Sequence, residues 1–173
     1  TPEVCLFNSD VLPIQSGWLQ PLFRTRLMVP EAMVAPLLLT DEGRIQHAGM
    51  TAQPLGMGDL SACVHSLKGL DPAQLKALSP NGLPYDVELL SGAALMFERQ
   101  RFLALGGFNP VFGRGDFEDL DFSLRWRRAG GRLLLLLRVR RARRLLLGRR
   151  RRRRVDAAIL AARDHWHEGL ASD

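Results

Sequence analysis

Residues 115–125 read Gly-Asp-Phe-Glu-Asp-Leu-Asp-Phe-Ser-Leu-Arg, and this stretch carries more information about the fold than any other part of the chain. It holds four carboxylates within the six residues from Asp116 to Asp121 and then continues at helical spacing. Phe117, Leu120 and Leu124 fall at i, i+3 and i+7. This spacing predicts a helix that buries the three side chains along one stripe.

The acidic residues at the start of this helix have two interpretations. Asp116 is suited to the N-cap, with Asp119 three residues later in the capping-box position. Glu118 and Asp119 would lie in the first turn, where the helix dipole favours the charged form of a carboxylate. Asp121 and Arg125, at i and i+4, would form an ion pair. The cluster is therefore either a well-capped surface helix or the place of a general base held in its ionised form.

Composition indicates a globular protein. The chain has 173 residues, of which 46% are hydrophobic, enough for one domain with a core. Its apolar runs are far shorter than the ~20 residues of a membrane-spanning helix, and no signal peptide is visible. Cys5 and Cys63 lack the spacing of a metal site, and the apolar run around Cys5 predicts a buried free thiol. A reducing compartment fits this cysteine usage.

The basic character of the chain comes from one segment. The net charge is +6, from 24 Lys and Arg against 18 Asp and Glu. Residues 132–154 hold twelve arginines and no acid, so the rest of the chain has twelve bases against eighteen acids and a net charge of −6. We therefore divide the chain into a domain over residues 1–131, an irregular Arg- and Leu-rich segment over residues 132–154, and a C-terminal helix within residues 155–173.

Apolar runs and turn residues predict the order of the elements. The run at residues 4–7 predicts a buried parallel strand that ends at Asn8-Ser9-Asp10. Further strands are expected at residues 34–39, 44–49, 87–97 and 133–137, and helices at residues 17–27, 72–78 and 98–105. Glycine pairs at residues 106–107 and 130–131 are expected to end the helices before them. Residues 52–84, rich in Gly, Pro, Ser and Asn, are expected to form a long loop.

These elements predict an α/β fold, and they place polar residues where such folds bind ligands. In open α/β sheets the ligand site lies beyond the carboxyl ends of the strands. Asn8, Ser9 and Asp10 follow such a strand end. In the strand expected at residues 87–97, the small residues 92–94 leave room for another group to approach the backbone closely.

A series of short motifs in a fixed order resembles a known family. After Asn-Ser-Asp come Gly-Trp-Leu (17–19), Val-Ala-Pro (34–36), Gly-Arg-Ile-Gln-His-Ala-Gly (43–49), Leu-Ser-Gly-Ala-Ala-Leu-Met (90–96), Leu-Gly-Gly-Phe (105–108) and Phe-Glu-Asp-Leu-Asp-Phe-Ser-Leu-Arg (117–125). Each piece is weakly specific, whereas the ordered series is strongly specific. Over residues 3–132 it resembles the inverting family 2 glycosyltransferases of GT-A fold, in particular rhamnosyltransferase-like enzymes that build bacterial surface polysaccharides.

The resemblance implies a partial GT-A fold, the fold of nucleotide-diphospho-sugar transferases, with a mixed sheet flanked by helices. It covers the C-terminal half of that domain, so the strands that form the pocket for base and ribose would be missing. Without them, the strand at residues 4–7 is expected to leave an apolar edge exposed. The histidine that the family usually has after the position of Gly131 is replaced by arginines.

The resemblance also implies a donor site. Asn8 and Asp10 match the family's Asp-X-Asp element, with Asn in place of the first acid. Asp10 would hold a divalent cation, Mg²⁺ or Mn²⁺, that bridges the diphosphate of a nucleotide sugar. Ser91 and Gly92 would border the acceptor and the donor sugar. The alternative for Asp10 is a simple turn residue at the end of a strand.

The acidic motif matches the catalytic part of the family. Glu118 and Asp119 match its Glu-Asp motif, in which Asp119 would be the general base that deprotonates the acceptor hydroxyl, with Glu118 as the other candidate. The alternative for Asp119 is a helix-capping role. His47 lies in a motif of a subset of these enzymes, and a histidine in such a position is more often a structural residue of a strand. Cys63 and His65 are expected in a solvated loop.

The implied reaction is transfer of a sugar from a nucleotide-diphosphate sugar to an acceptor hydroxyl with inversion, assisted by a metal, in cell-surface polysaccharide synthesis. The acceptor would be a glycan or lipid-linked, and the enzyme cytoplasmic, at the inner face of the membrane. Two alternatives stand beside it: an inactive fragment of this fold, or a basic module that binds nucleic acid or an anionic membrane through residues 138–154. No aromatic residues interleave with these arginines, which argues against stacking on nucleic-acid bases.

Overall fold

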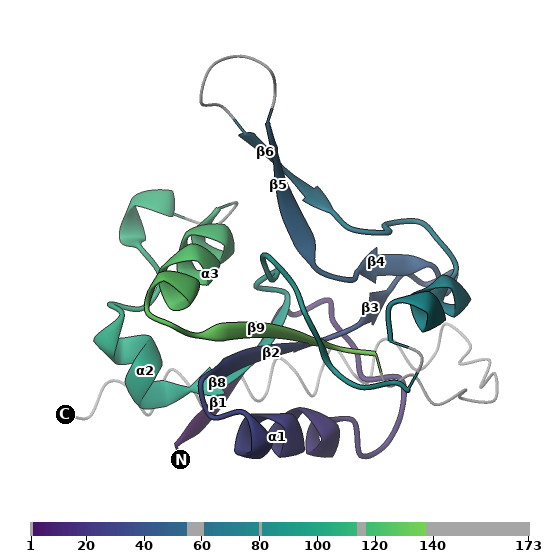
Figure 1. Cartoon of the computed structure of the whole chain (residues 1–173), viewed down its shortest axis with the longest axis horizontal. Helices are drawn as coiled ribbons and strands as arrows, with labels where there is room; N and C mark the ends of the chain where they lie inside the picture. The colour runs from purple at the N-terminus through teal and green to yellow at the C-terminus, as the bar shows by residue number, and fades with distance from the viewer. Residues whose placement is uncertain (1, 55–60, 80, 114–116, 138–173) are drawn as a thin grey trace. The chain divides into compact units, whose positions relative to one another are not determined.

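The computed structural model describes residues 2–54, 61–79, 81–113 and 117–137, all within one compact unit, residues 1–140 (Figure 1). Its helices are α1 (Leu19–Met28), α2 (Arg99–Ala104) and α3 (Glu118–Arg128), with 3₁₀ helices η1 (Pro72–Ala77) and η2 (Pro110–Phe112). Its strands are β1 (Glu3–Phe7), β2 (Ala32–Pro36), β3 (Leu38–Leu39), β4 (Ile45–His47), β5 (Met50–Pro54), β6 (Ser61–His65), β7 (Tyr85–Asp86), β8 (Ala94–Glu98) and β9 (Arg132–Leu136).

Among the described residues, five strands form the central sheet, in the order β1-β8-β2-β9-β7. β2 and β9 are parallel, whereas β8 is antiparallel to both of its neighbours, so the sheet is mixed. The prediction of a buried parallel strand at residues 4–7 is wrong: β1 is antiparallel to β8, lies at the edge of the described sheet and is only half-buried. A short apolar run does not encode the direction or number of its partner strands.

Helices pack on both faces of this sheet, which confirms the α/β class (Figure 1). On one face, Leu22 of α1 packs in a cluster with Met96 of β8. On the other face, Phe122 and Trp126 of α3 pack with Phe97. Because successive residues of a strand point to opposite faces, the neighbours Met96 and Phe97 serve the two clusters in turn.

The stretch predicted as one long loop, residues 52–84, contains regular structure. β5 and β6 form an antiparallel hairpin in which Met50 lies opposite His65 and Pro54 opposite Ser61. The loop prediction failed because the residues of these strands are mostly small or polar and show no alternation of apolar and polar positions. The helix expected at residues 72–78 is present as η1, and the Asp71 carboxylate accepts a hydrogen bond from the Ala73 N–H (2.8 Å) at its start.

Two predicted strands are interrupted. The strand expected at residues 34–39 is divided at Leu37 into β2, which belongs to the central sheet, and β3, which pairs with β4. The strand expected at residues 87–97 begins only at Ala94, and the residues before it form a loop bridged once to β5 through Leu89. This loop supplies the backbone of the candidate site.

α3 begins at Glu118 and buries a different face from the one predicted. Phe117 is in the N-cap position without a side-chain cap hydrogen bond, and Asp116 lies outside the described residues. The side chains of Phe122, Ser123 and Trp126 are buried, whereas Phe117 is 58% exposed. The predicted stripe of Phe117, Leu120 and Leu124 is wrong because the two aromatic rings of Phe122 and Trp126 pack with Phe97 and occupy the core instead.

The C-terminus of α3 ends at the predicted glycine pair. The Gly130 N–H donates to the Arg127 carbonyl oxygen (2.9 Å) and the Gly131 N–H to the Trp126 carbonyl oxygen (2.9 Å), which is the Schellman pattern. Gly130 has φ +76, a conformation that glycine adopts without steric cost. A Cβ on Gly131 would lie 2.3 Å from the indole ring of Trp126. The two glycines are therefore required for different reasons.

We expect Gly131→Ala to destabilise the fold more than Gly130→Ala. The added methyl group at residue 131 would displace the buried Trp126 indole, at a cost of about 2 kcal/mol or more. At Gly130 nothing lies within 4 Å of the added Cβ, so only the backbone strain of about 1 kcal/mol applies. Urea unfolding of both variants measures the difference. Equal or reversed losses of unfolding free energy would contradict the predicted clash.

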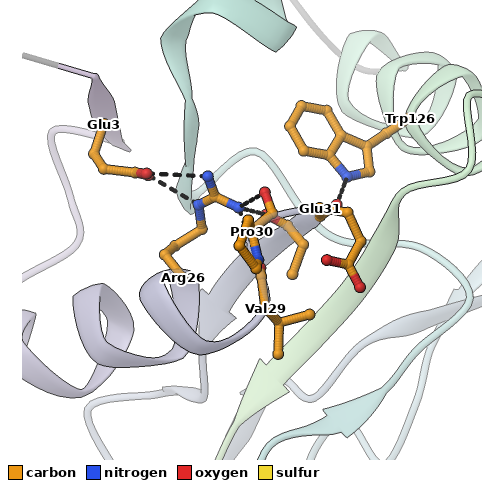
Figure 2. Close-up of polar contacts among 7 residues, drawn as sticks. Glu3, Arg26, Val29, Pro30, Glu31 and Trp126 are labelled. Atoms are coloured by element: carbon orange, nitrogen blue, oxygen red, sulfur yellow. Dashed lines mark hydrogen bonds and ion pairs between the residues drawn. The ribbon is translucent and has the colours of Figure 1, made fainter.

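Arg26, at the end of α1, joins three parts of the fold (Figure 2). Its guanidinium donates from Nε and Nη2 to the two carboxylate oxygens of Glu3 on β1 (2.9 and 3.0 Å). Nη1 donates to the carbonyl oxygens of Val29 (3.3 Å), Ala32 (2.7 Å) and Pro30. The side chain is only 3% exposed, so one buried cation satisfies carbonyl groups at the entry to β2 and ties α1 to the edge strand.

The Arg- and Leu-rich segment begins as part of the sheet. β9, at residues 132–136, pairs with β2 and β7, as the strand prediction at residues 133–137 anticipates, so the first residues of this segment are regular. The remainder, with the predicted basic module at residues 138–154 and the predicted helix within residues 155–173, lies outside the described residues. In the described ranges, no helix is long and apolar enough to cross a membrane.

Candidate functional site

The loop before β8 is held from two sides. At the end of β1, the Asn8 N–H donates to the Ala93 carbonyl oxygen (3.0 Å). From α3, the buried Ser123 hydroxyl accepts from the Leu90 N–H (3.2 Å) and donates to the Leu90 carbonyl oxygen (3.3 Å). The loop therefore has a defined backbone conformation between two elements that are distant in sequence. The sequence motifs do not single out Ser123, although a hydroxyl on the apolar face of α3 is a signal for such a contact.

Asp119 points from α3 to the middle of this loop. Its Oδ2 accepts a hydrogen bond from the Gly92 N–H (2.7 Å), and its Oδ1 accepts one from the Leu120 N–H (2.8 Å). These bonds differ from the expected capping box, in which the carboxylate would return to the backbone before the helix. Two N–H donors orient the carboxylate, and each oxygen can still accept a further hydrogen bond.

Gly92 allows this close approach. A Cβ built on Gly92 would lie 3.2 Å from the Asp119 Cβ and 3.7 Å from Oε1 of Glu118. The space predicted above the small residues 92–94 is thus occupied by the two acidic residues of α3. Oε2 of Glu118 is buried and has no hydrogen-bond partner within the described residues. A buried carboxylate oxygen without a donor is costly, so a hydroxyl group placed here would stabilise it.

Two histidines adjoin the same loop. His47 on β4 is 1% exposed, and its Nδ1 lies 3.3 Å from Nδ1 of His65 on β6. Its other ring nitrogen, Nε2, lies 3.5 Å from the Ser91 N–H nitrogen, within hydrogen-bonding geometry. The expectation that Cys63 and His65 lie in a solvated loop is wrong: both are half-buried in β6, and no periodicity in residues 61–65 indicates it.

The charge of Asp119 reaches the hairpin. Burial lowers the pKa of His65, Lys68 lowers it further, and the Asp119 carboxylate raises it. The pKa of the Cys63 thiol is raised first by burial and then by Asp119 and Glu88. The other free cysteine, Cys5, has its pKa raised to about 11 by burial. Two residues of β6 therefore lie in the electrostatic field of the candidate base, and both thiols are protonated at neutral pH.

Because His47 is buried in its neutral form, the unfolding free energy is expected to decrease at acidic pH. Burial, and then the neighbouring His65, lower the pKa of His47 to about 3. This value lies below the pKa of ~6.5 that a histidine has in an unfolded chain. The contribution of neutral His47 to the unfolding free energy is therefore complete above about pH 6.5 and is lost as the pH falls toward the folded-state pKa.

Between pH 7 and pH 5, the unfolding free energy should decrease by about 2 kcal/mol more in the wild type than in His47→Gln, which does not titrate. Urea unfolding at the two pH values measures this. Identical pH slopes for the two proteins would show that the pKa of His47 is not lowered.

The predicted donor-side residues lie at the end of β1. Asn8, Ser9 and Asp10 are exposed, and the Val11 N–H donates to the Asn8 carbonyl oxygen (3.1 Å) to close a turn. Through Asn8 this turn is bonded to the loop of Ser91 and Gly92. Over the ranges that the structure describes, no three or more His, Cys, Asp or Glu side chains are grouped so that they could hold a metal ion.

In the part of the chain that the structure describes, the loop before β8 is bonded to an oriented carboxylate, Asp119, and to the exposed turn that carries Asp10, and a buried Glu118 oxygen without a hydrogen-bond partner lies close to the same loop. A carboxylate oriented in this way can accept a proton. The mixed sheet with helices on both faces is a glycosyltransferase-like GT-A fold, present in part. It matches the crystal structure of GalNAc-T7 with UDP, GalNAc and Mn²⁺ at a TM-score of 0.57 and 18% sequence identity, over 79% of this chain and 26% of that chain.

Two curated proteins are similar in sequence. The chain is 28% identical over 129 residues to "Putative polypeptide N-acetylgalactosaminyltransferase 13" of Drosophila melanogaster. The matched region covers 74% of this chain and 22% of the relative. The chain is 30% identical over 131 residues to uncharacterized protein y4gI of Sinorhizobium fredii (strain NBRC 101917 / NGR234), which covers 73% of this chain and 13% of the relative. The chain thus spans a small part of the relatives that it matches. No family model matches it.

Proposed function

We propose that this chain is part of a glycosyltransferase that uses a nucleotide-diphosphate sugar and that it carries the catalytic base. The observation that supports this most directly is the Asp119 carboxylate, which the Gly92 N–H holds at 2.7 Å beside the start of β8. The GT-A-like fold, the ordered motifs, and the likeness to a named N-acetylgalactosaminyltransferase and to a structure with UDP and GalNAc support the substrate class.

In the proposed reaction, Asp119 accepts the proton of an acceptor hydroxyl. The acceptor oxygen forms its bond to the anomeric carbon as the bond from that carbon to the nucleotide diphosphate breaks, and the leaving group takes the electron pair. One such displacement inverts the anomeric carbon, and inversion here rests on the family 2 resemblance. The buried Oε2 of Glu118 would accept a hydrogen bond from a sugar hydroxyl, which orients the sugar beside the base.

A divalent cation fits the residues at the end of β1. Mg²⁺ and Mn²⁺ prefer oxygen ligands, and in nucleotide sites Mg²⁺ is commonly bound by one or two carboxylates together with substrate phosphates and water. Asp10 is exposed and offers such a carboxylate, and Asn8, two residues earlier, is exposed as well. When bound, the cation would neutralise charge on the departing diphosphate. Asp10 and Asn8 would position that diphosphate relative to the loop of Ser91 and Gly92.

The setting of the reaction is also part of the proposal. The family resemblance supports a cytoplasmic enzyme at the inner face of the membrane that extends a glycan or lipid-linked acceptor of a surface polysaccharide. The test is to incubate the full-length protein with a panel of nucleotide-diphosphate sugars, with Mn²⁺ or with EDTA. Release of nucleotide diphosphate with one sugar donor is the expected result, and NMR of the product reports the anomeric configuration. No turnover with any donor would overturn the proposed activity, and a retained anomer would overturn inversion.

We expect Gly92→Ala to reduce transfer while the protein remains folded. The new Cβ would press on the Asp119 Cβ at 3.2 Å and shift the carboxylate by a few tenths of an ångström. Small displacements of a base lower kcat/KM, here by about tenfold or more. Gly43→Ala is the control for an added methyl group, because nothing lies within 4 Å of its Cβ and its positive φ (+77) adds only backbone strain. Equal activity of the two variants would contradict the positioning role of Gly92.

A further inference from the structure

A chain of contacts leads from the β5–β6 hairpin to the candidate base. Nδ1 of His65 lies 3.3 Å from Nδ1 of His47, with the rings edge to face. Nε2 of His47 lies 3.5 Å from the Ser91 amide nitrogen. The next residue, Gly92, donates its N–H to Oδ2 of Asp119 at 2.7 Å. Three hydrogen bonds thus connect β6, β4, the loop before β8 and α3.

The number of protons on each group determines which group donates and which accepts in each of these hydrogen bonds. A backbone N–H can only donate, so Nε2 of His47 must carry the lone pair that accepts the Ser91 bond. A neutral imidazole has one N–H, and His47 therefore carries its proton on Nδ1. That proton can be donated only if Nδ1 of His65 is an acceptor. Neutral His65 then carries its proton on Nε2.

We propose that His65 and His47 are positioning residues that hold the Ser91–Gly92 turn, and through it the Asp119 carboxylate, by means of these opposite tautomers. His47 is buried and reaches the turn from β4, so it supports the backbone behind the donor to Asp119. His65 sets the tautomer that lets His47 do so. Neither side chain is assigned contact with substrate. The catalytic part of this inference rests on the proposed function, whereas the tautomers do not.

Protonation of His65 would interrupt this series of hydrogen bonds. A protonated His65 carries N–H groups on both ring nitrogens, so its Nδ1–H would face the Nδ1–H of His47 and one contact must break. The titratable or charged groups that act on His65 are His47 from β4, Lys68 from the turn after β6 and Asp119 from α3. Burial and Lys68 lower the pKa of His65, which keeps the ring neutral at neutral pH despite Asp119.

The tautomers can be measured directly by nitrogen NMR of protein labelled with ¹⁵N-histidine, without any substrate. We expect His47 in the Nδ1–H form and His65 in the Nε2–H form at pH 7.5. His47 in the Nε2–H form, or His65 doubly protonated, would overturn the proposal. This readout remains decisive even if the protein transfers no sugar.

Two variants separate positioning from simple packing. The amide oxygen of Asn lies near the place of Nδ1, so His65→Asn can still accept from His47, whereas His65→Leu cannot. We expect hydrogen exchange of the Gly92 amide to accelerate about tenfold in His65→Leu and to stay near the wild-type rate in His65→Asn. Unchanged exchange of the Gly92 amide in His65→Leu, or equal acceleration in the two variants, would overturn the proposed positioning role of His65.

If the protein transfers sugar, kcat should fall about tenfold in His65→Leu at unchanged donor KM, and His65→Asn should restore it. A change in the donor KM with kcat unchanged would contradict the proposed effect of His65 on the Asp119 carboxylate. A failure of the proposed function would instead appear as no turnover in the wild type, with the tautomers and Gly92 exchange as predicted.

Discussion

Asp119→Asn is expected to lower kcat/KM for sugar transfer by about 10²- to 10⁴-fold, the usual contribution of a general base. The amide oxygen of Asn can still accept the Gly92 N–H, so the loop before β8 keeps its bond to α3. What is lost is the ability to take a proton from the acceptor hydroxyl, together with the bond that Oδ1 accepts from the Leu120 N–H. Steady-state kinetics of the full-length protein measure the loss, and circular dichroism with urea unfolding shows that the fold is retained.

Asp121→Asn is the matched control for this variant. Asp121 lies on the same helix two residues later, but its carboxylate accepts hydrogen bonds from Arg125 Nε (2.8 Å) and Nη2 (2.6 Å). Its loss should weaken this partly exposed ion pair by about 1 kcal/mol or less and leave transfer near the wild-type rate. If Glu118→Gln abolishes transfer while Asp119→Asn does not, Glu118 is the base. Full activity of both Glu118→Gln and Asp119→Asn would show that the general base does not lie in this motif.

Arg26→Met is expected to reduce the unfolding free energy by about 3–5 kcal/mol, the largest stability effect predicted here. Methionine has a similar apolar stem but removes the cation that binds the Glu3 carboxylate and the carbonyl oxygens of Val29, Pro30 and Ala32. A carbonyl group or carboxylate that loses its donor in a buried site costs far more than the bond contributes when formed. Urea unfolding followed by tryptophan fluorescence measures the loss.

Arg24→Met, on the same helix, is the control for this substitution. Arg24 is exposed, so its replacement should change the unfolding free energy by less than about 0.5 kcal/mol. Adding Glu3→Gln to Arg26→Met should recover part of the loss, because the second change removes a charge that the guanidinium balanced. Similar effects of Arg24→Met and Arg26→Met would show that the buried network contributes little.

Elements with strong local signals could be predicted from the sequence. α2 ends before the glycine pair at residues 106–107, and α3 ends in a Schellman motif at residues 130–131, as expected from glycine alone. The ion pair between Asp121 and Arg125 follows from helical spacing and is present. These features depend on neighbouring residues, so a local pattern is sufficient to find them.

Features that depend on distant segments could not be predicted. The buried face of α3 was misassigned because three residues at helical spacing compete with Phe122 and Trp126, and only the packing against Phe97 decides between them. Residues that meet through tertiary structure leave no spacing to read, as with Gly92 and Asp119 or with His47 and His65. The acidic motif left open whether its carboxylates cap the helix or include a general base, and it did not indicate which backbone group would hold Asp119.

The way the loop before β8 is held has a consequence for folding kinetics. Its partners are Asn8, His47, Asp119 and Ser123, so its bonds close chain segments that are separated by many residues. Closing long chain segments costs entropy before the contacts repay it, which slows their formation relative to local hairpins. We therefore expect the β5–β6 hairpin to gain amide protection early in refolding and the Gly92 amide to gain it last. A nascent chain would acquire its base only after α3 has been synthesised and docked.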